Sequence, residues 1–184
     1  MKQRLLFLGP PGAGKGTQAQ QLASARGLLH LSTGDLLRAE VAAGSPLGQE
    51  AKAVMARGEL VSDALVLAIV RQRLETRSEG EGWLLDGFPR NLQQAEALEI
   101  LLAELGQPIE LVVLLELDDA LLIQRLLNRG RDDDNEAVIR NRLEVYRQQT
   151  APLIQHYLDQ GLLQAVEAEG SVEQIGARIT ALLE

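Results

Sequence analysis

The chain has no cysteine, which excludes disulfide bonds, thiolate zinc sites and a cysteine nucleophile. It does not open on a charged segment followed by an apolar run, as a secretory signal would. No apolar run approaches the roughly 20 residues that cross a bilayer. Its 184 residues are 46 % hydrophobic, so we expect one folded domain with small attached lobes, in the cytoplasm and not in a membrane.

Positive charge is also scarce, and the net charge is −8. An acidic protein is a poor match for nucleic acid, whose phosphates attract basic faces. Only 3 of the 18 basic residues are lysines, and the other 15 are arginines. Arginine binds phosphate oxygens through two parallel donors, which lysine cannot do. The bias indicates a phosphate site if the arginines converge, and otherwise it reflects a GC-rich genome.

Short apolar runs alternate with stretches of helical periodicity along the chain. Strands are predicted at 4–8, 28–31, 83–86, 109–117 and 162–167. Helices are predicted at 14–25, 91–105, 119–128, 136–159 and from 171 onward, with a longer helical stretch up to 77 that breaks at 44–46 and 58. This alternation predicts an α/β fold with a parallel sheet. Two polar excursions, 32–61 and 129–135, are either moving lobes or ordinary surface connections.

The segment GPPGAGKGTQ, residues 9–18, follows the first predicted strand and opens a helix. It fits the phosphate-loop pattern as far as Lys15, but Gly16 stands where Ser or Thr is usual and Thr17 follows one residue late. Glycines let backbone N–H groups surround phosphate oxygens, and the lysine adds a positive charge. The displaced hydroxyl predicts Mg²⁺ held mainly through waters that Asp86 orients. A glycine-rich turn without a ligand, and an aspartate that merely ends a strand, are the alternatives.

Three further segments accompany this loop in order: LSTGDLLR at 31–38, DGFPR at 86–90 followed by Gln94, and RGRDDD with RNRLEVY at 129–146. Together the four segments resemble the nucleoside monophosphate kinases, and most closely the adenylate kinase family with a short lid. In that family the Gly-Thr order of the phosphate loop is normal. The resemblance covers nearly the whole chain, and the pair STGD and DGFPR is highly specific.

The resemblance implies a P-loop NTPase-type three-layer fold with a five-stranded parallel sheet. The core would comprise 1–31, 62–128 and 136–184, with a nucleoside monophosphate-binding lobe at 32–61 and a short lid at 129–135. It implies reversible transfer of the terminal phosphoryl group of Mg-ATP to AMP, giving two ADP. The expected partners are ATP, AMP and ADP, bound by a monomer that binds neither nucleic acid nor membranes. Mg²⁺ arriving with ATP is the expected metal, and zinc is not expected.

The resemblance also implies a role for individual residues. It assigns donor ATP binding to Gly12, Ala13, Gly14, Lys15, Gly16, Thr17, Arg129 and Gly170. It assigns AMP binding to Thr33, Arg38, Glu59, Leu60, Val61, Gly87, Phe88, Pro89, Arg90, Gln94, Arg131 and Arg142. The catalytic set would be Lys15, Asp86, Arg90, Arg125, Arg129, Arg131 and Arg142.

The predicted acceptor is a phosphate oxygen that is already anionic, so the reaction needs no general base, and the chain shows no Ser/His/Asp or Cys/His set. Arg125 and Arg129 share a helix face, although cations at a helix C-terminus also follow from the helix dipole. His30 and His156 have no ligand-like spacing and are expected to be structural or exposed.

Three alternatives remain open at this stage. A UMP/CMP kinase would share the fold and chemistry, but Thr33 and Gln94 favour adenine. A silent nucleotide-binding switch would not need Lys15, Asp86 and the arginines together. A shikimate-kinase-like enzyme would share the phosphate loop but would not need STGD or DGFPR.

Overall fold

The computed structural model describes residues 1–57, 61–130 and 135–184 of the chain. Its centre is a five-stranded sheet in the order β2-β3-β1-β4-β5, and every neighbouring pair is parallel. The strands are β1 (Arg4–Leu8), β2 (Leu29–Ser32), β3 (Trp83–Asp86), β4 (Leu111–Glu116) and β5 (Leu163–Glu167). The predicted α/β fold with a five-stranded parallel sheet is therefore confirmed.

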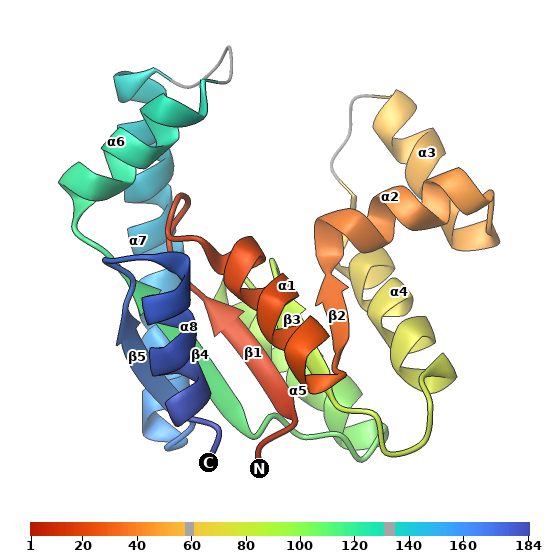
Figure 1. The fold of residues 1–184 in the computed structure, drawn as a ribbon. Helices are drawn as coiled ribbons and strands as arrows, with labels where there is room; N and C mark the ends of the chain where they lie inside the picture. Colours follow the sequence, from red (N-terminus) through yellow and green to blue (C-terminus); the bar gives the residue numbers. More distant parts are fainter. Residues whose placement is uncertain (58–60, 131–134) are drawn as a thin grey trace.

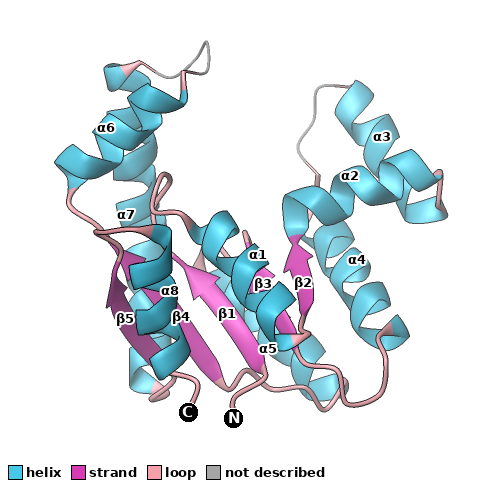
Figure 2. Ribbon diagram, viewed as in Figure 1, coloured by secondary structure: helices cyan, strands magenta, loops and turns pink. Residues whose placement is uncertain are grey.

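Helices cover both faces of the sheet, as Figures 1 and 2 show. The helices of the first half are α1 (Lys15–Arg26), α2 (Thr33–Ala43), α3 (Pro46–Ala56) and α4 (Asp63–Thr76). Those of the second half are α5 (Leu92–Glu104), α6 (Asp119–Arg129), α7 (Glu136–Asp159) and α8 (Val172–Ala181). In Figure 1, α1 and α8 lie on the near face of the sheet and α5 lies on the far face.

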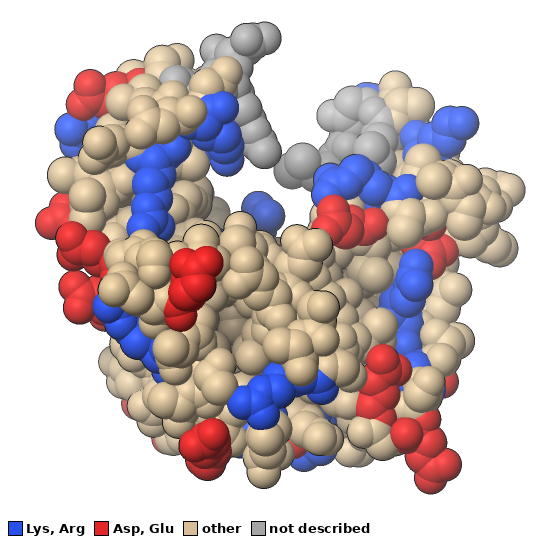
Figure 3. All heavy atoms as spheres, viewed as in Figure 1, with Lys and Arg blue, Asp and Glu red and all other residues tan. Residues whose placement is uncertain are grey.

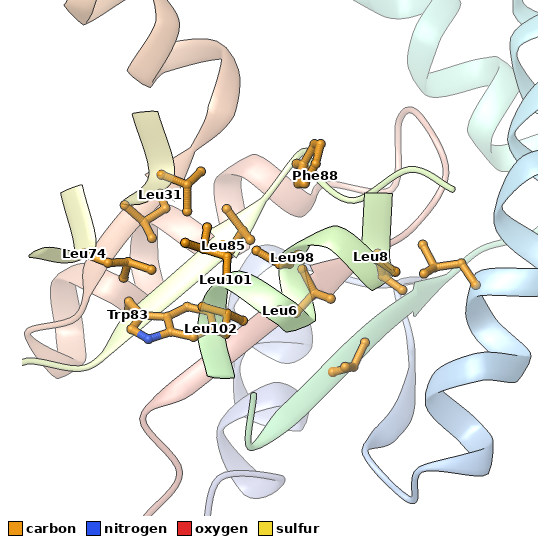
Figure 4. Packing of buried hydrophobic residues seen from close by; sticks show 14 of the residues in the cluster. Leu6, Leu8, Leu31, Leu74, Trp83, Leu85, Phe88, Leu98, Leu101 and Leu102 are labelled. Carbon is orange, nitrogen blue, oxygen red and sulfur yellow. The ribbon is translucent and has the colours of Figure 1, made fainter. Parts of the chain in front are cut away.

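Two apolar clusters form the core, one on each face of the sheet. Along β1, Leu5 and Phe7 join the cluster beneath α1, α6 and α8, whereas Leu6 joins the cluster with α4 and α5. This alternation follows from the two-residue period of a strand, and it explains why β1 is apolar from Leu5 to Leu8. Figure 4 shows the cluster formed with α4 and α5, in which Trp83, Leu98 and Leu102 pack together.

The predicted break at 44–46 coincides with two helix ends. Gly44, at φ 65°, closes α2, and Pro46 opens α3. The side chain of Ser62 accepts a hydrogen bond from the backbone of Leu65 at the start of α4. The predicted strand at 109–117 is shorter, at Leu111–Glu116, with Pro108 shortly before it and the N-cap Asp118 shortly after it.

The chain rises beyond the sheet at two places (Figure 1). Helices α2 and α3 project from one side, and α6 with the start of α7 projects from the other. The parallel strands end at the base between these two parts, the edge where α/β proteins bind ligands. The ends of the predicted lobes, at 58–60 and 131–134, lie outside the described residues.

Candidate active site

The phosphate loop lies between β1 and α1 and is built on glycines with positive φ. Gly12 has φ 85°, and Gly14, the N-cap of α1, has φ 92°. A Cβ on Gly12 would lie 3.0 Å from Cγ of Leu126, so the loop packs closely against α6. Side chains rarely adopt these φ values, and the helix N-terminus behind the loop offers unpaired N–H groups. The loop has the backbone form of an anion-binding site.

Lys15 is the first residue of α1, and its ammonium reaches back over the loop to donate to the carbonyl oxygen of Gly9. Burial lowers the pKa of Lys15 from 10.5 to about 8, with the Asp86 carboxylate opposing this effect and Arg90 adding to it. A bound anion would supply the negative charge that this buried ammonium favours.

Asp86 ends β3 directly beside the phosphate loop, since Phe7 and Asp86 are register partners. Its residue surface is 8 % exposed, and its Oδ2 lies 2.6 Å from Nε2 of His30 on the neighbouring strand β2. His30 was expected to be structural or exposed, and it is a half-buried partner of Asp86. Sequence reasoning missed this contact because it depends on the pairing of β2 with β3.

The turn after Asp86 lies against Thr33 of α2 and against Thr150 of α7. Gly87 has φ 91°, and a Cβ there would lie 2.7 Å from Oγ1 of Thr33, so only glycine fits. Arg90 Nε donates to the carbonyl of Gly87 at 3.1 Å, and Phe88 is buried beneath. Thr150 Oγ1 donates to the carbonyl of Arg90 at 3.3 Å, which ties the turn to α7.

These segments enclose one cleft of about 630 Å³. Of the predicted site residues, the cleft is lined by Lys15, Thr33, Asp86, Gly87, Pro89, Arg90 and Arg142. Figure 3 shows basic side chains on both sides of the hollow between the two raised parts of the molecule. Segments from both halves of the chain thus meet at one surface that carries both signs of charge.

Helix α7 forms a wall of this cleft that sequence reasoning only partly identified. Arg142 was predicted, but Val145, Tyr146 and Gln149 also line the cleft. Burial raises the pKa of Tyr146 to about 12, with the Glu116 carboxylate adding to the effect. The spacing 142, 145, 146 and 149 is one face of a helix, a signal that was available in the sequence.

Arg125 lies on α6 and contacts the backbone of the phosphate loop. Its Nη1 donates to the carbonyl of Gly12 at 3.4 Å, and its Nη2 donates to the carbonyl of Ala168, after β5, at 2.9 Å. Arg129 is the last residue of α6, one turn further along. The predicted sharing of a helix face by these two arginines is confirmed, and Arg125 joins α6 to the phosphate loop and to the residue after β5.

Arg38 is exposed on α2 and pairs with Asp35, one turn earlier on that helix. The hydrogen bond from Arg38 is the main cause that lowers the pKa of Asp35. Gln94, on α5, accepts a hydrogen bond from the backbone N–H of Arg90 at 2.7 Å and donates to Asp63 Oδ1 at 2.9 Å. Arg38 is thus paired within α2, and Gln94 is held between the cleft residue Arg90 and Asp63 on α4.

Thr33 also borders a narrow apolar cavity between α2 and α4, whose other walls are Leu36, Leu37, Val66, Ile69 and Val70. Val61 is half-buried and packs against the core cluster that includes Leu36 and Ile69. Sequence reasoning missed Leu37 and Val66 because apolar helix residues have no distinctive signal before the two helices are brought together.

The remaining predicted residues lie in the phosphate loop and the first turn of α1, before α8, or outside the described chain. Ala13 is buried, and Gly16 and Thr17 are exposed on the first turn of α1. Gly170 has φ 123° and precedes the N-cap of α8. Glu59, Leu60 and Arg131 lie outside the described residues.

The described residues also bear on the predictions about zinc and about membranes. Residues 1–57, 61–130 and 135–184 contain no group of three or more His, Cys, Asp or Glu side chains arranged to hold a metal ion. None of the helices described is long and apolar enough to cross a membrane.

A five-stranded parallel sheet with a phosphate loop after β1, and a basic cleft at the carboxyl ends of β1 and β3, defines a P-loop phosphotransferase. Residues 7–162 match the family model for adenylate kinase. The chain is 74 % identical to the adenylate kinase of Parasynechococcus marenigrum (strain WH8102) over 183 residues, which cover 100 % of both chains. It is 73 % identical to the adenylate kinases of Synechococcus sp. (strain CC9311) and Prochlorococcus marinus (strain MIT 9303), over 100 % and 97 % of each chain.

The chain therefore belongs to the adenylate kinase family. This membership confirms the family resemblance of the four motifs and the prediction of a nucleotide kinase.

Proposed function

We propose that the cleft between the phosphate loop and the turn at 86–90 transfers the terminal phosphoryl group of ATP to AMP, giving two ADP. The observation that carries the proposal is the meeting of Lys15, Asp86, Arg90 and Arg142 in one cleft of about 630 Å³. The reaction is that of the family to which the chain belongs.

The donor side of the proposed site is the phosphate loop. Backbone N–H groups from Gly12 to Thr17 hold the ATP phosphates at the N-terminus of α1, and Lys15 adds its charge. Arg129 binds ATP from the end of α6, and Gly170 lies near the donor base. Arg125 acts at the phosphates through the loop backbone that it contacts.

The acceptor side comprises Thr33, Arg38, Val61, the turn Gly87–Arg90, Gln94 and Arg142, with Glu59, Leu60 and Arg131 from outside the described residues. Arg90 and Arg142 bind the AMP phosphate, because both guanidinium groups belong to the cleft wall. Thr33 and Gln94 contact the adenine. Thr33 lines the cleft, which supports its role.

Catalysis in this site rests on positioning and charge. An oxygen of the AMP phosphate attacks the terminal phosphorus of ATP, and the bond from that phosphorus to the bridging oxygen of ADP breaks. No proton has to be removed from the acceptor. Lys15 and the arginines offset the repulsion between the two anionic substrates and hold them in line.

Mg²⁺ that arrives with ATP would neutralise part of the charge on its phosphates. Asp86 fits a role in orienting its waters, because a buried carboxylate ends β3 in the cleft beside Lys15. Thr17, exposed on the first turn of α1, is a second candidate.

The raised parts on either side of the cleft support closure of a lobe at 32–61 and a lid at 129–135 around the bound nucleotides, which would exclude water. A monomer is the proposed working unit, as the family resemblance implies. We also keep the cytoplasm as the proposed compartment.

The test is ADP formation from Mg-ATP offered with AMP, UMP, CMP, GMP, shikimate or no acceptor. Rapid turnover with AMP and little with the others is expected. Preference for UMP or CMP would overturn the assignment of Thr33 and Gln94. Binding of ATP without turnover on any acceptor would favour a silent switch.

A further inference from the structure

The side-chain amide of Gln94 is held in one orientation by two partners of opposite character. Its Oε1 accepts from the backbone N–H of Arg90 at 2.7 Å, and its Nε2 donates to Oδ1 of Asp63 at 2.9 Å. A backbone N–H can only donate, and a carboxylate oxygen can only accept. The two contacts therefore fix which end of the amide carries oxygen and which carries nitrogen.

Asp63 reaches Gln94 from a different helix. It is the first residue of α4, directly after the N-cap Ser62, and it follows the segment that the proposed function places at the acceptor base. Gln94 is half-buried on the first turn of α5, where Asn91 caps the helix and accepts from the backbone N–H of Gln94 at 2.9 Å. The contact joins α4 to α5 next to the proposed AMP site.

The two contacts leave the Gln94 amide with one lone pair and one N–H. This pair matches the edge of adenine, which has an amino donor at N6 and an acceptor at N1. A 6-oxopurine such as hypoxanthine offers the reverse, with an acceptor at O6 and a donor at N1. To bind it in the same place, the amide would have to turn over.

We propose that Asp63 is a specificity-determining positioning residue, which locks Gln94 in the orientation that accepts adenine and rejects 6-oxopurines. Turning the amide would set its N–H groups against the Arg90 N–H and its oxygen against the Asp63 carboxylate, so both contacts would become repulsive. Discrimination thus comes from penalties on the wrong base as well as from contacts with the right one. The inference rests on the proposed function, in which Gln94 contacts the acceptor base.

The test compares kcat/KM for AMP and for IMP, two nucleotides that differ at position 6 of the base, at saturating Mg-ATP. Asp63→Ala should lower the AMP-to-IMP ratio of kcat/KM by about tenfold, because the oxygen of a turned Gln94 amide would no longer face a carboxylate. It should act through KM for the acceptor, with KM for ATP within about twofold of wild type. Asp63→Asn should also lower the ratio, by less, since an asparagine can turn to offer either a donor or an acceptor.

Ser62→Ala is the matched control, because it weakens the start of the same helix without touching Gln94. It should reduce thermal stability and leave the AMP-to-IMP ratio unchanged. An equal change of the ratio in Ser62→Ala would assign the effect to the helix start and overturn the role of Asp63.

Gln94→Ala separates this inference from the function on which it rests. A ratio that falls in Gln94→Ala but not in either Asp63 variant overturns the role of Asp63 and leaves the base reading by Gln94 standing. A ratio unchanged in Gln94→Ala overturns both. Failure of the wild-type chain to phosphorylate AMP would overturn the proposed function itself.

Discussion

At the scale of single residues, Lys15 combines burial with a positive charge. In the unfolded chain its pKa is 10.5, and in the fold it is about 8. Between these two pH values the unfolded state binds more protons, so raising the pH stabilises the fold. Below pH 8 the full cost of burying the charge is present, and a bound phosphate would offset it.

Lys15→Met should therefore change the pH dependence of stability. Below pH 8, wild type should be less stable relative to the variant than at high pH, and the relative stability of wild type should rise between about pH 8 and 10.5. Urea unfolding of both proteins without nucleotide, at pH 7 and pH 10, measures the difference. A difference that does not change with pH would contradict burial of the charged ammonium.

Arg90 is a second residue whose role can be isolated. Its guanidinium donates to the Gly87 carbonyl at an exposed position, while its backbone holds Gln94 and Thr150. Arg90→Ala keeps those backbone contacts and should lower turnover by about 10²–10³-fold, with a melting temperature near that of wild type. Steady-state kinetics and a thermal melt check this. Near-normal turnover would remove Arg90 from the site.

At the scale of elements, Arg125 ties α6 to the phosphate loop and to the residues after β5. Arg125→Ala should lower the free energy of unfolding by about 1–2 kcal/mol and weaken ATP binding more than AMP binding, because two backbone carbonyls lose their donor. Gln124→Ala, on the exposed side of α6, is the matched control. Urea unfolding and nucleotide titration measure both effects. If Arg125→Ala kept full stability and lost turnover, its guanidinium would act only by binding phosphate, which would contradict the structural role.

The elements themselves were largely predictable from the sequence. The runs RLLFL and WLLD match β1 and β3 in full, since a strand covered on both faces is apolar along most of its length. Gly44 and Pro46 marked the break between α2 and α3 for local backbone reasons. The motif residues Lys15, Asp86 and Arg90 were predicted together and line one cleft.

Contacts between elements could not be predicted in the same way. The pairing of His30 with Asp86 depends on the pairing of β2 with β3, and that of Asp63 with Gln94 on the approach of α4 to α5. His30 and Asp63 look like ordinary polar residues in the sequence, because their partners lie 56 and 31 positions away. These contacts form only when folding brings the elements together.

At the scale of the whole molecule, an acidic chain with a net charge of −8 collects basic side chains around one cleft. Some acidic residues elsewhere form ion pairs at the surface, as in the contact of Arg4 with Glu110 at 3.2 Å. The cleft opens between two helical parts that rise from the carboxyl edge of the sheet (Figure 1). This arrangement lets two polyanions meet on a protein that would otherwise repel them.

The most direct test of the central claim follows the terminal phosphoryl group itself. ATP labelled in that group is mixed with AMP, Mg²⁺ and enzyme, and the products are separated. The account predicts label in the β-phosphate of the ADP formed from AMP, with two ADP for each AMP consumed, and none with Lys15→Met. Label released as free phosphate, or transfer that Lys15→Met leaves intact, would contradict it.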